Sequence, residues 1–300
     1  MVMPSALFME NAERYYVNIR DNNAWLNKNR DHASILEIDD VRQFIQNIVL
    51  GKNMPEEGPG VENITVNEPT LKNSDLSLEF VLHSPVEIHL EDELGRHTGI
   101  IENPDPNSDF RLYEKQIPNS YYFEFGEKKY AGMDHEPTIV VLKGEDLGVF
   151  SLDIKEMLGE DIISSTRFFD IPVSENTTAT MQIEDGVNNI VLNIDCDSNG
   201  ISDISIRPSE EYSAKDVLSV LAEIVRSLSM NEKTKKILIQ KIQSAKKQVE
   251  KNNLNAANSM LENIKHIVIV FSGNLTPAQD RISKDEAEKL LRILDTIKIK

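Results

Sequence analysis

The sequence contains a single cysteine, Cys196, and no CxxC pair or Cys/His cluster. A disulfide within the chain is therefore excluded, as is a thiolate metal site of the usual spacing. Long apolar runs are also lacking, since the longest candidate is IVIVF at residues 267–271, far short of the roughly 18 apolar residues of a membrane span. The first residues show no basic segment followed by an apolar one, so we expect no signal peptide in the chain.

Positive charge is scarce, because 32 Lys and Arg stand against 50 Asp and Glu, giving a net charge of −18. Residues 1–210 carry 16 basic and 39 acidic side chains, whereas residues 211–300 carry 16 basic and 11 acidic ones. The acidic region of residues 1–210 would be repelled by the phosphate backbone of a nucleic acid. Nucleic acid is therefore not an expected partner. The lysine-rich stretch at residues 233–251 marks either an acidic partner or a solvated helix face.

The pattern along the chain predicts a multidomain α+β protein with three domains. A short N-terminal part, residues 1–54, is followed by a linker at 55–60 within the Gly- and Pro-rich stretch GKNMPEEGPG. Residues 61–210 contain short β-rich runs separated by turn residues, which predicts an antiparallel β-sandwich. The runs are LSLEFVL (76–82), VEIHLED (86–92), YYFEF (121–125), TIVVLKG (138–144), GVFSLDI (148–154), TATMQIE (178–184) and NNIVLNI (188–194).

Residues 211–300 change to a helical period and predict an antiparallel helical bundle. A first helix is expected from a capping box at Ser213 and Asp216, and its apolar stripe runs from Val217 to Leu228. Further helices are expected over 237–249 and 254–267. The last one should begin at Ser283, with Glu286 three residues later.

A lone histidine, His32, precedes a short amphipathic segment that ends at Gly51. Asp39 or Asp40 is expected to cap this helix, and its apolar face comprises Val41, Phe44, Ile45, Ile48 and Val49. In α/β-hydrolases the catalytic histidine lies on a loop before the last helix. Together with the segment Met3, Pro4, Ser5 and Ala6, the stretch resembles the C-terminal end of a lipase or acyltransferase-type α/β-hydrolase. That resemblance implies that His32 is the catalytic base of a serine ester hydrolase.

The nucleophile that such a histidine serves is missing from this sequence. The chain has no G-x-S-x-G elbow and no glycine motif for an oxyanion loop. Cys196 offers no substitute, because the flanking Asp195 and Asp197 disfavour its thiolate. We therefore expect this chain by itself to be inactive, as the C-terminal part of a secreted or surface acyl-ester hydrolase. From the residues alone, a loop histidine that satisfies a hydrogen bond beside Asp31 is the favoured interpretation of His32, because lone histidines are common.

The stretch SPVEIHLEDELGRHTG, residues 84–99, and the later EKQIPNSYYF resemble an Ig-like accessory module of large secreted or surface proteins. The matching positions are Asp92, Gly95, Arg96, Gly99, Ile117, Pro118, Ser120, Tyr121 and Tyr122. Two histidines fall in this region. We interpret His89 as an outward strand residue and His97 as a turn residue, because the spacing pairs neither with a nucleophile or carboxylate.

The segment DCDSNGISD, residues 195–203, alternates oxygen-bearing side chains as a loop around a hard cation does. The candidate Ca²⁺ ligands are Asp195, Asp197, Asn199, the backbone carbonyl of Ile201, and Asp203. Gly200 would permit the sharp turn. An EF-hand would place a bidentate Glu at the twelfth position, where this chain has Ile206. The alternatives are a weak calcium site and a β-hairpin that binds no metal; no organic cofactor is expected.

The helical C-terminal region resembles a FIVAR-type module of extracellular proteins, in NLNAANSMLENI and RISKDEAEKLLRIL. The matching positions are Ala256, Ala257, Leu261, Ile264, Ile282, Ser283, Glu286 and Ala287. The resemblances together imply an extracellular or cell-surface location. The alternative function, from a different class, is a non-catalytic adhesion module that contacts a surface protein or a glycan.

Overall fold

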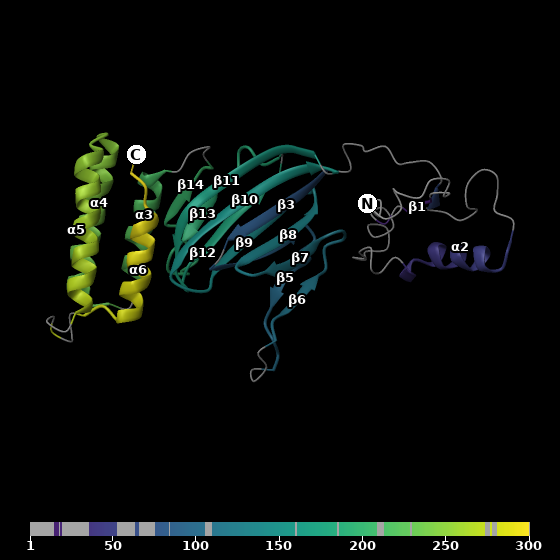
Figure 1. The fold of residues 1–300 in the computed structure, drawn as a ribbon, viewed down its shortest axis with the longest axis horizontal. Coiled ribbons are helices and arrows are strands. Elements are labelled where there is room, and N and C mark those ends of the chain that lie inside the picture. The colour runs from purple at the N-terminus through teal and green to yellow at the C-terminus, as the bar shows by residue number, and fades with distance from the viewer. Residues whose placement is uncertain are drawn as a thin grey trace.

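The computed structural model describes most of the chain beyond residue 75 and short parts of the region before it. The described residues are 15–17, 19, 36–52, 64–65, 76–83, 85–105, 110–159, 161–184, 186–208, 213–228, 230–273, 277 and 281–299. They form a mixed α+β structure with two large antiparallel sheets and five helices (Figure 1). The expectation of an α+β chain with antiparallel sheets is therefore confirmed.

One sheet has five strands and the other has seven, and all pairings are antiparallel. In spatial order, the five-stranded sheet contains β11 (Asp161–Val173), β10 (Gly148–Leu158), β3 (Leu76–His83), β8 (Lys128–Asp134) and β7 (Tyr121–Phe125). The seven-stranded sheet contains β14 (Ile204–Ile206), β13 (Leu192–Asp195), β12 (Thr178–Ile183), β9 (Thr138–Gly144), β4 (Val86–Asp92), β5 (His97–Ile101) and β6 (Leu112–Lys115).

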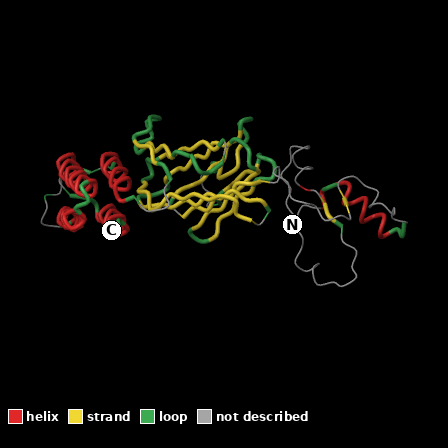
Figure 2. Tube along the Cα trace, turned by 90° about the horizontal axis from the view of Figure 1, so that it is seen from above, coloured by secondary structure: helices red, strands yellow, loops and turns green. Residues whose placement is uncertain are grey.

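Alternation along the strands explains why the two sheets lie against each other (Figure 2). Leu78, Phe80 and Leu82 of β3 are buried in the core, as are Ile88 and Leu90 of β4, while the intervening Glu79 and His89 are polar. Successive side chains of a strand point to opposite faces, so each sheet directs one apolar face inward. Both faces contribute to a single hydrophobic core.

Four helices continue this core beyond the sheets. They are α3 (Ala214–Ser227), α4 (Glu232–Glu250), α5 (Leu254–Ser272) and α6 (Lys284–Thr296). Helix α3 contacts β11 and α6 contacts β10, whereas α4 and α5 form the outer layer (Figures 1 and 2). An ion pair between Lys289 of α6 and Asp146, 2.7 Å long, adds a polar contact between the helices and the sheets.

The caps of these helices follow from their first residues. The hydroxyl of Ser213 accepts a hydrogen bond from the backbone of Asp216 at the start of α3. Ser283 and Glu286 form the reciprocal capping box that was expected at the start of α6. Each cap satisfies backbone N–H groups that the first helical turn leaves without an intrahelical acceptor.

The described part of the N-terminal region has a small core of its own. Helix α2 (Asp39–Val49) packs through Val41 and Phe44 near the strand pair β1 (Tyr16–Val17) and β2 (Ile64–Thr65). Gly51, with φ +61°, ends the helix as expected. The expected cap was wrong, because the capping position is Ile38 and its side chain makes no cap hydrogen bond. None of the described helices is long and apolar enough to cross a membrane.

Candidate cation-binding loop and a buried histidine pair

His32 lies outside the described residues, as do Met3, Pro4, Ser5 and Ala6. The structure therefore does not place the predicted catalytic base. The following helix is present, but only part of its predicted apolar face is buried: Val41 and Phe44 are covered, whereas Ile45, Ile48 and Val49 are exposed.

The segment 195–203 forms the connection between β13 and β14 at the end of the seven-stranded sheet. Its register is fixed by antiparallel pairing of Ile194 with Ile204 and by the backbone N–H of Asp203, which donates to the carbonyl of Ile194. Gly200 has φ +84°, a conformation that favours glycine, as the sequence suggested. The loop is therefore a hairpin connection of eight residues, 196–203, with its acidic side chains gathered at one place.

Three of the predicted ligands come together in this loop. Asp195, Asp197 and Asp203 each offer a carboxylate oxygen, and the three oxygens lie within 4.8 Å of one another. The other two predicted ligands are not shown to join them. The side-chain oxygen of Asn199 accepts a hydrogen bond from the backbone of Ile201, 2.8 Å long, and Ile201 itself is exposed.

Backbone N–H groups hold the Asp195 carboxylate in place. Its Oδ1 accepts from Asp197 and Asn199, each at 3.2 Å, and its Oδ2 accepts from Gly200 at 2.7 Å. Partial burial raises the pKa of Asp195, but the N–H groups of Gly200, Asp197 and Asn199 outweigh it and leave the pKa below its usual value. A carboxylate has about four acceptor positions, so these bonds leave one of them for a cation.

Cys196, in the same loop, is not a reactive thiol. The side chain is buried, and burial together with the negative charges of Asp203 and Glu223 raises the pKa of its thiol. The backbone N–H of Cys196 donates to Asp203 Oδ2 over 2.9 Å, which fixes that carboxylate. Cys196 therefore positions an acidic group and adds no chemistry of its own.

The two histidines of the middle region form a site that the sequence interpretation missed. His89 belongs to β4 and alternates with the core residues Ile88 and Leu90, so it lies on the outer face of the sheet as expected, but it is only 7% exposed. His97 is the first residue of β5 and not a turn residue. His89 Nδ1 and His97 Nε2 lie 3.0 Å apart, and His97 Nδ1 lies 2.8 Å from Glu114 Oε1.

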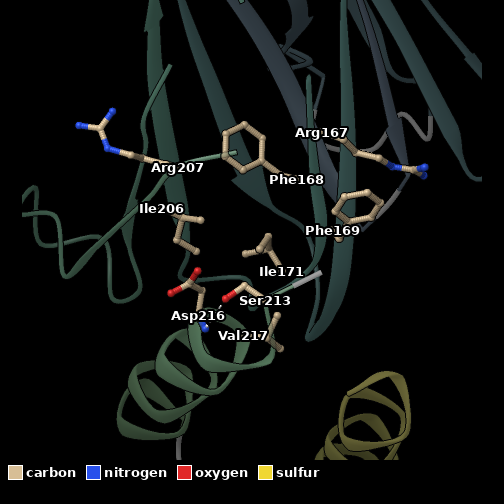
Figure 3. A pocket seen from close by; sticks show the side chains of 9 residues that line it. All are labelled: Arg167, Phe168, Phe169, Ile171, Ile206, Arg207, Ser213, Asp216 and Val217. Carbon is tan, nitrogen blue, oxygen red and sulfur yellow. Dashed lines mark hydrogen bonds between the residues drawn. The ribbon is translucent and has the colours of Figure 1, made fainter. Parts of the chain in front are cut away.

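A shallow pocket lies where β11, β14 and the first turn of α3 meet (Figure 3). Phe168, Ile171 and Ile206 are among the apolar side chains that line it. The guanidinium groups of Arg167 and Arg207 point away from this apolar lining in Figure 3. Arg167 is already paired with Asp153 at 2.8 Å and lies over the ring of Phe169. The pocket therefore does not gather positive charge around a ligand.

Comparison of the chain with protein families, with curated proteins and with solved structures gives no match.

Proposed function

We propose that this chain acts as a calcium-stabilised, non-catalytic binding module of an exported or cell-surface protein. The observation that carries the proposal is the convergence of the Asp195, Asp197 and Asp203 carboxylates at the β13–β14 hairpin. In this function the sheets and helices present a surface to another protein or a glycan. Calcium fixes the loop at the end of the sheet.

The choice of calcium follows from the ligand type. Carboxylate and carbonyl oxygens suit hard cations, and Ca²⁺ accepts six to eight of them in flexible geometry. Asn199 and the carbonyl of Ile201 would complete the set together with water. A loop with no bidentate Glu suits the weak affinities of extracellular modules, about 10⁻⁴ to 10⁻³ M. A site of this affinity would be filled only where calcium is abundant, as it is outside the cell.

Calorimetric titration of the full chain with calcium tests this function. We expect one ion per chain, a loss of binding in Asp197→Asn, and tighter binding in Asn199→Asp, because a carboxylate replaces an amide oxygen. Asp161→Asn serves as the matched control, since it removes the same charge from an exposed position at the start of β11. No heat of binding in the unmodified chain, or equal binding in Asp197→Asn and the unmodified chain, would reject the function.

We further propose that the two sheets constitute an Ig-like sandwich and that α3–α6 constitute a FIVAR-type module. The shared core of the two sheets supports the first assignment. The capping box of α6 and the buried Ala257, Leu261 and Ile264 of α5 support the second. The two sheets, with five and seven strands, together contain more strands than the seven to nine of immunoglobulin domains. The module would therefore be an enlarged variant.

A second function, that residues 1–54 belong to a serine ester hydrolase, is favoured by one feature of α2. Ile48 and Val49 are 52% and 78% exposed although they belong to an amphipathic helix. In a hydrolase domain these side chains would pack against the central sheet, and His32 would transfer the proton of a serine encoded upstream. An in-frame G-x-S-x-G segment in the gene before Met1 would support this function, and a stop codon there would reject it.

We expect the chain itself to show no hydrolysis of short acyl esters. The physical reason is that a histidine base without its serine nucleophile cannot form an acyl intermediate. Initial rates with the unmodified chain and with His32→Ala should both equal the buffer blank, with a known serine esterase as the positive control. Turnover that disappears in His32→Ala would contradict this expectation.

A further inference from the structure

Four side chains of the seven-stranded sheet form a continuous chain of contacts across β4, β5 and β6. Glu87 Oε2 lies 3.6 Å from His89 Nε2, and His89 Nδ1 lies 3.0 Å from His97 Nε2. His97 Nδ1 then lies 2.8 Å from Glu114 Oε1. Each imidazole therefore directs one nitrogen toward a carboxylate and the other toward its partner ring.

The carboxylates decide where the protons of the two rings lie. An ionised carboxylate only accepts hydrogen bonds, so His97 Nδ1 carries a proton and donates it to Glu114. His89 Nε2 is buried, has no hydrogen-bond partner among the described residues, and faces Glu87. A proton on His89 Nε2 therefore points toward the Glu87 carboxylate.

With both outer nitrogens protonated, the two inner nitrogens point lone pairs at each other across 3.0 Å. A cation between them removes this repulsion. We propose that His89 Nδ1 and His97 Nε2 are the protein ligands of a divalent transition-metal ion of the zinc class. On binding, the ion takes both lone pairs, while the outer N–H groups remain directed at Glu87 and Glu114.

The surroundings fit a small ion bound by two imidazoles. Two nitrogens at about 2.0–2.1 Å from a tetrahedral zinc ion lie about 3.3 Å apart, so the rings need to separate slightly from 3.0 Å and tilt so that both lone pairs converge on the ion. Gly99 lies opposite His89 in the strand register, and a Cβ there would lie 3.1 Å from His97 Nε2. The missing side chain leaves room beside that nitrogen. His97 is 18% exposed, so water reaches the ion and completes its coordination.

Glu87 and Glu114 are placed to orient the two histidine rings, as carboxylates do in known metal sites. Metal-bound histidines commonly donate their other ring N–H to a carboxylate, which fixes the tautomer and makes the ligand more basic. Glu114 is held in turn by Gln116, whose amide donates to Glu114 Oε2 over 2.7 Å. Arg111 holds Glu87 at 2.6 Å. Imidazole nitrogen prefers Zn²⁺, Cu²⁺ and Ni²⁺ over calcium, so this site is distinct from the oxygen loop at 195–203.

Titration of the full chain with Zn²⁺, and with Co²⁺ as a spectroscopic probe, tests the proposal. We expect one ion per chain and loss of binding in His97→Ala. Glu114→Gln keeps both ligands but weakens the orienting contact, so its affinity should fall about 10-fold to 100-fold. Because His97 is partly exposed, we expect His97→Ala to fold. Circular dichroism of each variant reports whether the sheet is retained.

Two variants serve as controls. His266→Ala removes an exposed histidine of α5, and Asp197→Asn removes a ligand of the acidic loop; both should bind Zn²⁺ as the unmodified chain does. No zinc binding by the unmodified chain would overturn the proposal. In that case, nitrogen NMR signals that show a single proton shared between the two rings would identify a proton, and not a metal ion, between His89 Nδ1 and His97 Nε2. Zinc affinity that is unchanged in both His97→Ala and Glu114→Gln would overturn it as well.

Discussion

Calcium at about one hundred times its dissociation constant is expected to raise the free energy of unfolding of the chain by about 2.7 kcal/mol. The three carboxylates converge only in the folded hairpin, because the pairing of β13 with β14 brings Asp203 back beside Asp195. An ion that binds this arrangement and not the unfolded chain shifts the equilibrium toward the folded state. For a folded unit of this size the melting temperature should rise by roughly 5–10 °C.

Thermal unfolding followed by circular dichroism, in EDTA and in calcium at several concentrations, measures this effect. Asp197→Asn should abolish the shift while preserving the loop, because the Asn199 N–H that now donates to Asp197 can donate to an amide oxygen as well. Asp161→Asn should keep the shift. A melting temperature that millimolar calcium leaves unchanged would mean that the Asx-type hydrogen bonds of Asp195 hold the hairpin without an ion.

The sequence predicted the strands best where alternation is regular. The runs at 76–82, 86–92 and 138–144 are the strands β3, β4 and β9. β5, β6, β8 and β11 were missed, and the sequences of β8 and β11 show why. β8 has Gly132 in its interior, and β11 is a strand of 13 residues that pairs with β10 through irregular register. Pairing with long neighbours, and not local propensity, defines these two strands.

The two candidate sites differ in how far sequence reasoning could reach. The acidic loop is contiguous, so spacing alone indicated which side chains could meet, and the structure brings together Asp195, Asp197 and Asp203. The histidine pair depends on sheet register, because Glu114 reaches His97 only through the alignment of β5 with β6. Seventeen residues separate these two side chains. No local spacing rule connects them, so only the three-dimensional structure reveals the pair.

Gly144, the last residue of β9, lies beside the segment that connects the two sheets. The close approach of that segment leaves no room for a side chain at Gly144. Residues 174–177 connect β11 of the five-stranded sheet to β12 of the seven-stranded sheet, and Gly144 donates its N–H to the carbonyl of Thr177 over 2.9 Å. A Cβ on Gly144 would lie 1.9 Å from the backbone oxygen of Ser174. That oxygen cannot rotate away, because the N–H of Thr177 donates to it within the turn.

Gly144→Ala is therefore expected to lower the free energy of unfolding by about 3 kcal/mol, the upper part of the range for overpacked sites. Chemical denaturation of the two proteins in EDTA measures the difference. Gly273→Ala is the matched control: its φ of −80° suits alanine and its nearest contact is 3.3 Å, so its effect should stay below about 1 kcal/mol. Equal stability of the two variants would contradict the close approach of Ser174.

The same substitution connects the sheet crossing to the acidic loop. Ser198 in the loop donates its hydroxyl hydrogen to the carbonyl of Asn176, 2.7 Å away, so displacement of residues 174–177 moves a support of the loop. We expect calcium to bind Gly144→Ala more weakly than the unmodified chain, whereas Gly273→Ala should bind it equally well. Unchanged calcium affinity in folded Gly144→Ala would show that the loop keeps its geometry without this support, and that the β13–β14 pairing is sufficient to hold it.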